Sequence, residues 1–206
     1  MPQDSEVDAL FTKLISDYEF TPAKKQMLCS KPINEKWNMY CQQMNEDSEA
    51  PSPEYLLKCL QVRPGPEVLA EIAKLLEKRR CSFLQRFIGL NLHQFCLSLL
   101  CTYNRKSNPF NPSDIPLNDV ITNSLLCLKN FSHTQFGQTL SAYSEAIPYL
   151  VESISSSSST NLEWAVEILI SFLADNKNGP IVANIKSCIK ALEAQSKSVW
   201  SNFSKE

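Results

Sequence analysis

The stretch Asn161–Ala174 reads NLEWAVEILISFLA and shows what kind of fold to expect. Its apolar residues recur at spacings of three and four, the period of a helix with one wide apolar face. A face this wide can contact neighbours on both sides, as the middle helix of a stacked array does. The stretch therefore favours a helical solenoid over a simple bundle. The face consists of Trp164, Ala165, Ile168, Leu169, Phe172 and Leu173.

The same spacing recurs elsewhere in the chain, whereas the features of a β-sheet are scarce. The 206 residues include only four Gly, and no stretch alternates apolar and polar residues for long. Little turn chemistry and little period-two pattern are therefore available for strands. We predict an all-α fold. The other regular apolar stripes are Val68, Ile72, Leu75 and Leu76; Leu92, Phe95, Cys96, Leu99 and Leu100; and Ile121, Leu125 and Leu128.

Capping residues and helix breakers divide the chain into elements. Ser or Thr followed by Pro, or by Glu three residues later, predicts helix starts at Thr21, Ser52 and Thr160. Together with the breaks, these signals indicate roughly ten helices, the later ones in pairs or triplets of about 40 residues. The breaks and linkers are expected at Pro64–Pro66, Asn104–Asn118 and Ser153–Ser159.

Charge and hydropathy exclude several classes of protein. The chain has 20 Lys and Arg against 22 Asp and Glu, well interspersed, so a nucleic acid is an unexpected partner. The longest nearly uncharged helical stretch, Phe87–Tyr103, contains too many polar residues for a membrane span. Residues Met1–Asp8 are acidic and polar, unlike a secretory signal. We therefore expect a cytoplasmic protein.

No motif for catalysis, metal binding or cofactor binding is present. The chain lacks HExxH, GxxxxGK[ST] and GxSxG, and its eight Cys form no CxxC pair. We expect reduced, mostly buried thiols, although Arg79 and Arg80 could make the neighbouring Cys81 reactive. The two histidines, His93 and His133, have no visible catalytic companion. We predict a regulator without a cofactor or a metal, not an enzyme.

Four segments, in this order and at compatible spacing, resemble the N-terminal regulatory region of diaphanous-related formins. They are LFTKLISDYEFTPAKKQMLCSKP at 10–32, SPEYLLKCL at 52–60, SFLQRFIGLNL at 82–92 and CLKNFSHTQFG at 127–137. The resemblance covers about residues 8–175, whereas residues 176–206 match less well. It implies a small helical GTPase-binding subdomain at 1–63, followed by a partial or shortened armadillo-like repeat array at 64–206.

The resemblance also implies a site for a Rho-family GTPase on two helices. On the subdomain it points to Lys36, Trp37, Met39 and Tyr40, whose amphipathic and adaptable side chains are typical interface anchors. The alternative is that some of these fill the core. On the first repeat it points to the helix end that carries Lys74, Glu77, Lys78 and Arg79. The alternative there is that the cations only complement the helix macrodipole.

A second implied site is a groove on the repeats that holds an amphipathic autoregulatory helix from the same polypeptide or a relative. Small residues would let the ligand helix approach, and polar residues would fix its register. Close packing inside the array is the alternative role for the small residues. The matching positions are Lys129, His133, Ser171 and Ala174.

Together these features predict a cytoplasmic, cytoskeleton-associated regulator of formin-driven actin assembly. A GTP-loaded Rho-family GTPase would dock across the short helices and the first repeat and loosen the autoregulatory helix. Actin would be reached only through domains outside this chain. Many family members have a valine and asparagines where this chain has Lys74 and Glu77–Arg79, so the choice of GTPase stays open. The alternative function is a constitutive helical-repeat scaffold that binds an unrelated peptide.

Overall fold

The computed structural model describes residues 2–104, 117–142, 147–156 and 159–174, and positions 179, 182–183, 185–187 and 190. Within these residues every element is helical, apart from one isolated bridge between Tyr18 and Arg80. The predicted all-α fold is therefore confirmed. No helix in the described part is both long and apolar enough to span a membrane.

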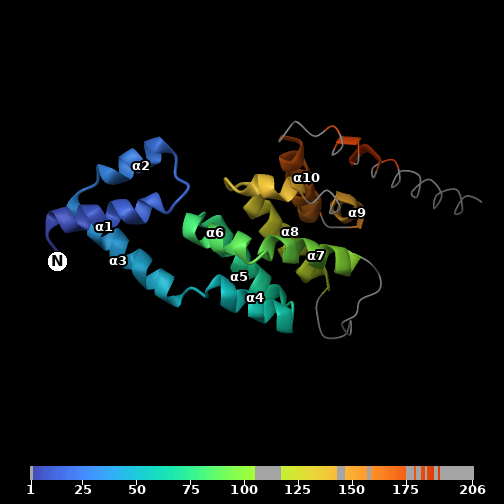
Figure 1. Cartoon of the computed structure of the whole chain (residues 1–206), viewed down its shortest axis with the longest axis horizontal. Helices are drawn as coiled ribbons and strands as arrows, with labels where there is room; N and C mark the ends of the chain where they lie inside the picture. Colours follow the sequence, from blue (N-terminus) through green and yellow to red (C-terminus); the bar gives the residue numbers. More distant parts are fainter. Residues whose placement is uncertain are drawn as a thin grey trace, which may run out of the picture.

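The helices form two groups, which lie one after the other along the long axis of the molecule (Figure 1). The N-terminal group consists of α1 (Asp4–Ser16), α2 (Pro22–Cys29) and α3 (Ile33–Glu49). The second group consists of α4 (Pro53–Val62), α5 (Pro66–Glu77), α6 (Cys81–Gly89), α7 (Leu92–Asn104), α8 (Leu117–Ser132), the 3-10 helix η1 (Gly137–Ala142), α9 (Ile147–Ser156) and α10 (Ser159–Ala174).

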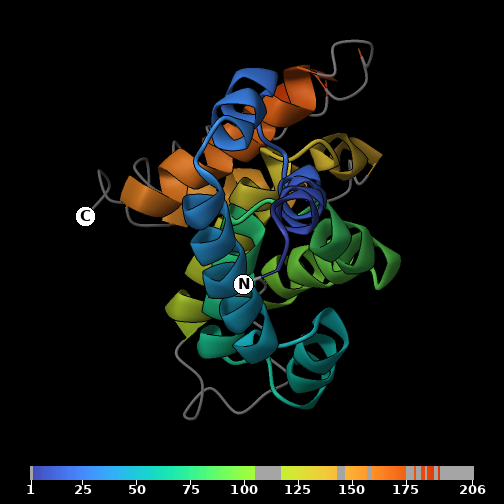
Figure 2. The same cartoon turned by 90° about the vertical axis from the view of Figure 1, so that its left-hand side faces the viewer.

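The N-terminal subdomain, α1–α3, has a small apolar core of its own. Phe11 and Ile15 of α1 meet Leu28 of α2, and Tyr40 of α3 packs against them. Thr21 caps α2 by accepting a 3.3 Å hydrogen bond from the amide of Lys24, as the sequence predicts. Viewed from this end, the subdomain lies in front of the repeats (Figure 2).

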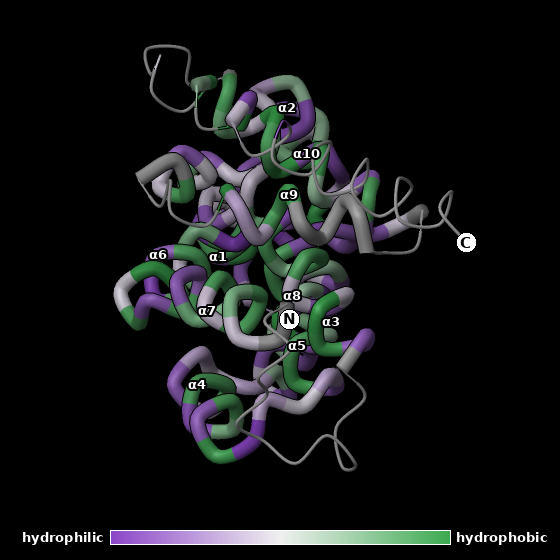
Figure 3. The backbone as a smooth tube through the Cα atoms, turned by 90° about the vertical axis from the view of Figure 1, so that its right-hand side faces the viewer, coloured by the Kyte–Doolittle hydropathy of each residue, from purple (hydrophilic) through white to green (hydrophobic). Residues whose placement is uncertain are grey.

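A second and much larger core runs through the helical array α4–α10. Helix α8 lies at its centre and packs against α5, α7 and α10. Phe87, Phe131 and Phe172, from three different helices, are almost completely buried in it. Hydrophobic and hydrophilic residues alternate along the backbone of these helices, as helical faces buried on one side require (Figure 3). The stacked arrangement is that of an armadillo-like array.

Polar side chains on α8 fix the register of this helix against α5. The thiol of Cys127 donates a 3.1 Å hydrogen bond to the carbonyl of Leu69. One turn later, Asn130 donates a 3.0 Å hydrogen bond from Nδ2 to the carbonyl of Ala73. Two α8 side chains three residues apart thus donate to two α5 carbonyls four residues apart. If α8 slid along α5, both hydrogen bonds would break.

The boundary predicted between residues 63 and 64 remains a prediction. Leu56 and Leu60 of α4 belong to the large core, and only α1–α3 contribute to the small core. Packing therefore offers a second place for the boundary, between α3 and α4. We use the name N-terminal subdomain for α1–α3 below.

Several predicted helix ends are confirmed, and two are wrong. Ser52 caps α4, and α5 begins within Pro64–Pro66, as expected. Thr160 is not an N-cap, because α10 already begins at Ser159. The linker predicted at Ser153–Ser159 is wrong at its start, since α9 continues to Ser156. The buried Ile147, Leu150 and Val151 anchor α9, and serine opposes a helix only weakly. Most of the linker expected at Asn104–Asn118 lies outside the described residues.

The chain leaves α8 through a tight turn, the α8–η1 turn, at residues 133–136. The amide of Gly137 donates a 2.9 Å hydrogen bond to the carbonyl of Thr134, whose amide donates in turn to Phe131 at 3.0 Å. A Cβ at Gly137 would lie 2.2 Å from the carbonyl oxygen of Ser132. Only glycine fits this close approach.

We predict that Gly137→Ala destabilises the chain by about 2 to 3 kcal/mol, because the added methyl group meets backbone that cannot move aside. Gly89→Ala is the matched control, since nothing lies within 4 Å of a Cβ there. At this exposed last residue of α6 the change should be neutral or stabilising by up to about 1 kcal/mol. Urea denaturation would measure both changes. Equal unfolding midpoints for the two variants would contradict the prediction.

Candidate functional site

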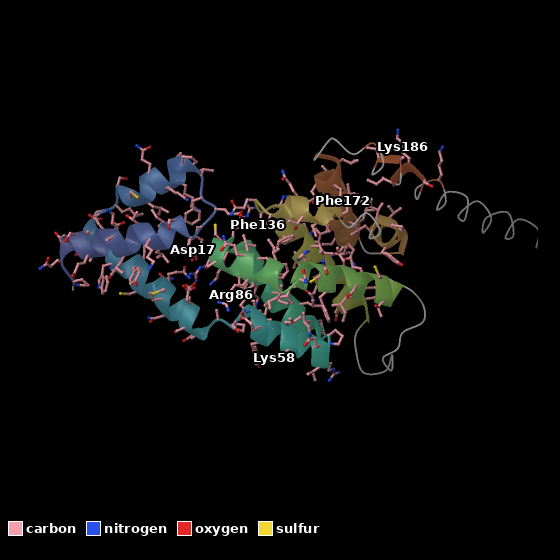
Figure 4. All side chains as sticks on the ribbon, in the orientation of Figure 1. Asp17, Lys58, Arg86, Phe136, Phe172 and Lys186 are labelled. Atoms are coloured by element: carbon pink, nitrogen blue, oxygen red, sulfur yellow. The ribbon has the colours of Figure 1, made fainter. Side chains whose placement is uncertain are left out.

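The N-terminal subdomain and the array meet at the start of α6, where Asp17 accepts three hydrogen bonds. Arg80 donates from Nε at 3.0 Å, and Ser82 donates from its amide at 2.8 Å and from Oγ at 2.7 Å. Figure 4 shows Asp17 at this meeting point. The N-cap residue Arg80 makes no side-chain cap of its own. The carboxylate of Asp17 therefore caps α6 from a distant part of the chain and complements the helix dipole.

Arg80 is the centre of this junction. Besides Asp17, its guanidinium forms an ion pair with Asp47 in the last turns of α3. It also lies over the ring of Tyr18, 5.6 Å from the ring centroid. Burial raises the pKa of Tyr18 to about 12, although the positive charge of Arg80 acts in the opposite direction. One cation thus holds α1, α3 and α6 together.

The backbone around Arg80 makes the junction compact. Arg79 has a φ of 52°, in the left-handed region, and this reverses the chain between α5 and α6. Its carbonyl accepts a 3.2 Å hydrogen bond from the amide of Glu19. The amide of Cys81 donates a 2.6 Å hydrogen bond to the carbonyl of Asp17. The segment between α1 and α2 is therefore bonded directly to the turn between α5 and α6.

A groove of about 590 Å³ opens beside this junction, between α1, α3 and the start of α6. One wall of the groove is apolar. The end of the groove that Asp17 and Arg80 line is polar. Such a combination of apolar walls and a few polar groups is typical of a binding site. The apolar wall consists of Leu10, Leu14, Tyr40 and Met44.

The residues predicted on α3 occupy different environments. Lys36 is buried and forms a 2.7 Å ion pair with Asp8 of α1, so it ties two helices of the subdomain together. Trp37 is half-buried and stacks on Tyr40, with ring centroids 5.8 Å apart. Met39 is 37% exposed. Of the four, Trp37, Met39 and Tyr40 offer surface to a partner.

The residues predicted at the end of α5, Lys74, Glu77, Lys78 and Arg79, are all exposed. Lys78 forms a 3.0 Å ion pair with Glu46 on α3, and Lys74 lies 3.5 Å from Glu71 on its own helix. The pair between Lys78 and Glu46 places the end of α5 against the last turns of α3. The two predicted halves of the GTPase site are therefore on adjoining elements.

The structure brings two of the four predicted groove residues, Lys129 and His133, together around one carboxylate, Glu167 of α10. Lys129 Nζ lies 3.8 Å and His133 Nε2 lies 3.2 Å from Glu167 Oε2. Ser171 follows one turn later on α10 and donates from Oγ to the carbonyl of Ile168 at 2.7 Å. Ala174 is the last residue of α10. Glu167 was not among the predicted residues, although its spacing of four from Ser171 indicates a shared face.

A protein-family model described as "Diaphanous GTPase-binding Domain" matches residues 1–174. The chain belongs to this family. The resemblance to the N-terminal regulatory region of diaphanous-related formins is thereby confirmed, and the matched residues agree with the predicted extent of 8–175. The chain is a regulatory, GTPase-binding domain.

The chain also matches two longer curated proteins. Both are named "Disheveled-associated activator of morphogenesis 1", from Mus musculus and from Homo sapiens. Each is 22% identical over 189 residues, which cover 82% of this chain but only 17% of the relative. No solved structure matches the chain.

The junction was missed in the sequence. The alternative that Arg79 and Arg80 activate the Cys81 thiol is not supported, because burial, together with the carboxylates of Glu19 and Asp17, raises the pKa of this thiol. The guanidinium of Arg80 is directed to Asp17 and Asp47 instead. In the part of the chain that the structure describes, no group of three His, Cys, Asp or Glu could hold a metal ion.

We predict that Arg80→Met destabilises the chain by about 2 to 3 kcal/mol. The carboxylates of Asp17 and Asp47 then lose the cation that they share. The effect should be smaller than the roughly 3 to 5 kcal/mol of a fully buried pair, since the three side chains remain 18–23% exposed and water screens them.

Arg86→Met is the matched control. Arg86 pairs with Glu54 but its side chain is 67% exposed, so its loss should cost less than about 1 kcal/mol. Urea denaturation of both variants would measure the difference. The assigned role of Arg80 fails if its loss costs no more than the loss of Arg86.

Proposed function

We propose that this domain binds the GTP-loaded form of a Rho-family GTPase across α3, the end of α5 and the groove beside Arg80. The observation that carries the proposal is the match to a GTPase-binding family, which extends over both groups of helices. The match covers the junction as well as the N-terminal subdomain, which supports a binding unit that includes the first repeat. The domain is then a regulator and not an enzyme.

The described surface supports this location. Met39 and Trp37 lie on the same helix as Tyr40 and Met44, which line the groove. Exposed aromatic and methionine side chains supply large contact areas at an interface. Charged residues at the end of α5, which adjoins α3, would form the polar rim and act mainly on the rate of association. The site thus has an apolar centre and a charged edge.

Lys36 contributes to this site indirectly. Its ammonium group is paired with Asp8 inside the N-terminal subdomain, so a partner would reach it only after breaking that pair. We assign it the role of fixing α3 against α1. In that role it orients its neighbours Trp37 and Met39 toward the partner.

For the groove on the array, we propose an amphipathic autoregulatory helix from the same polypeptide. Ser171 and Ala174 are small enough for a ligand helix to approach α10, and Lys129, His133 and Glu167 can fix its register. Glu167 is held between a lysine and a histidine, and a charged side chain of the ligand could exchange for one of these partners. The GTPase would favour release of this helix by preferring a different arrangement of the domain.

The remaining parts of the proposal concern the whole protein. The chain spans 17% of its curated relatives, so actin assembly would be controlled through domains outside these residues. A cytoplasmic, cytoskeleton-associated location follows from that role.

A second candidate function, a constitutive scaffold, is supported by one feature of α10. Leu162, Val166 and Ile170 form an apolar row four residues apart, and they are 40%, 38% and 57% exposed. An unrelated peptide helix could pack on such a row. Dependence of binding on the nucleotide state distinguishes the two functions, because a constitutive scaffold would not discriminate GTP from GDP.

The first test is a pull-down with a panel of Rho-family GTPases in both nucleotide states. We expect retention of at least one member in the GTP state and weak or no retention in the GDP state. Met39→Asp should lower that affinity about tenfold or more, because a charge would be buried at the contact. Lys74→Glu with Lys78→Glu should also lower it.

Met27→Asp is the matched control for this test, since Met27 is 58% exposed and lies on α2, which contributes no residue to the proposed site. It should leave the affinity unchanged. Retention of no GTPase would refute the proposed function, and equal effects of Met39→Asp and Met27→Asp would move the footprint elsewhere.

The proposed autoregulatory groove on the array is tested with Ser171→Asp and a synthetic peptide. The peptide carries the C-terminal amphipathic helix of the parent polypeptide. We expect at least about tenfold weaker binding, because the new carboxylate has no partner and lies one turn from Glu167. Ser98→Asp is the control, since Ser98 on α7 is exposed and makes the same 2.7 Å hydrogen bond to a carbonyl three residues earlier. Fluorescence anisotropy would give both affinities. A folded Ser171→Asp variant with normal affinity would place the groove elsewhere.

A further inference from the structure

The α8–η1 turn contacts both of the proposed binding regions. On one side, His133 Nε2 lies 3.2 Å from Glu167 in the proposed autoregulatory groove on the array. On the other side, the amide of Gln135 donates a 2.9 Å hydrogen bond to the carboxylate of Glu19, in the N-terminal subdomain. Gln135 Nε2 also lies 3.5 Å from the thiol of Cys81 at the start of α6. A single residue, Thr134, therefore separates the contact of His133 to the proposed autoregulatory groove from the contact of Gln135 to the subdomain.

The turn itself is rigid enough to link these contacts. Thr134 donates from Oγ1 to the carbonyl of Phe131 at 2.8 Å and accepts from the amide of Phe136 at 3.3 Å. Gly137 closes the turn at a distance that permits no side chain. In the view of Figure 4, Phe136 lies between Asp17 at the junction and Phe172 of α10. A displacement of Gln135 would therefore also displace His133.

Glu19 is equally well fixed to its own side. Its amide donates to the carbonyl of Arg79, and the neighbouring Tyr18 forms the bridge to Arg80. The carboxylate of Glu19 therefore moves with the segment between α1 and α2. A change in the position of the N-terminal subdomain would reach Gln135 through this carboxylate.

We propose that the α8–η1 turn is the element that couples the N-terminal subdomain to the autoregulatory groove, through Glu19 on one side and Glu167 on the other. The inference rests on the proposed function, because it describes how occupation of the GTPase site reaches the groove. Thermodynamic coupling is reciprocal, so a disturbance at the groove must also reach the subdomain. This reciprocity provides a test that needs no ligand.

The test is amide hydrogen exchange of the full chain with single substitutions. Glu19→Ala should speed exchange at Gln135 about tenfold, since it removes a hydrogen bond to a charged acceptor. Coupling predicts a further effect of about threefold at residues 167–171 of α10. In the reverse direction, Glu167→Gln should speed exchange of the Glu19 amide by a similar factor.

Matched controls separate coupling from a general loss of stability. Glu49→Ala removes an exposed carboxylate of α3 that makes no ion pair within the described chain. Glu163→Gln makes the same substitution as Glu167→Gln one turn earlier on α10. Neither control should alter exchange across the junction. Glu19→Gln, which keeps an acceptor oxygen, should lie between wild type and Glu19→Ala.

The coupling is refuted if Glu19→Ala speeds exchange only within the α8–η1 turn and leaves 167–171 at the control rate. A GTP-loaded GTPase selected in the pull-down supplies a second arm, in which bound GTPase should change exchange at 167–171. Binding without such a change would also overturn the coupling. If no GTPase binds, the proposed function fails, while the substitutions still decide whether the two regions are coupled.

Discussion

The ion pairs of Arg80 with Asp17 and Asp47 are the constraint on which the arrangement of this domain depends. The N-terminal subdomain and the array have separate apolar cores that share no buried residue. Apolar packing therefore stabilises each group but does not by itself fix one group against the other. Arg80 supplies that connection, because its guanidinium bonds to the end of α1 and to the last turns of α3 while its backbone begins α6.

The connection that Arg80 makes between the two groups is polar, and this affects how freely the groups can move relative to each other. A continuous apolar interface would make the two groups one rigid unit, whereas a small polar contact leaves their relative motion as the default expectation. Because these ion pairs are partly exposed, they contribute less free energy than a fully buried pair would, so a partner of ordinary affinity can outweigh them. The large core, with α8 at its centre, keeps the helices of the array packed together while the junction between the groups can respond.

Much of the fold could be predicted from the sequence, because apolar spacing reports directly which helix faces are buried. Ile168, Leu169 and Phe172 are buried as their spacing indicates, and Thr21 and Ser52 cap helices through local contacts. The junction could not be predicted, since Asp17 and Ser82 are brought together only by the tertiary fold. The burial of Lys36 was hidden for the same reason, because its partner Asp8 lies on another helix. Family resemblance supplied the candidate sites, and geometry added Glu167 and Arg80.

These features together separate two tasks that one chain must perform. Recognition needs preformed surfaces, and the small core beneath Tyr40 and the packed helices beneath Glu167 provide them. Communication needs an element that two ligands can displace in different directions, and a ligand with equal preference for all arrangements would shift nothing. The α8–η1 turn could meet this need, because it is stiff internally and contacts both sides through a few polar groups, Gln135 on one side and His133 on the other. Under the proposed coupling, stiffness within the turn would let a small displacement at Glu19 change the surroundings of Glu167.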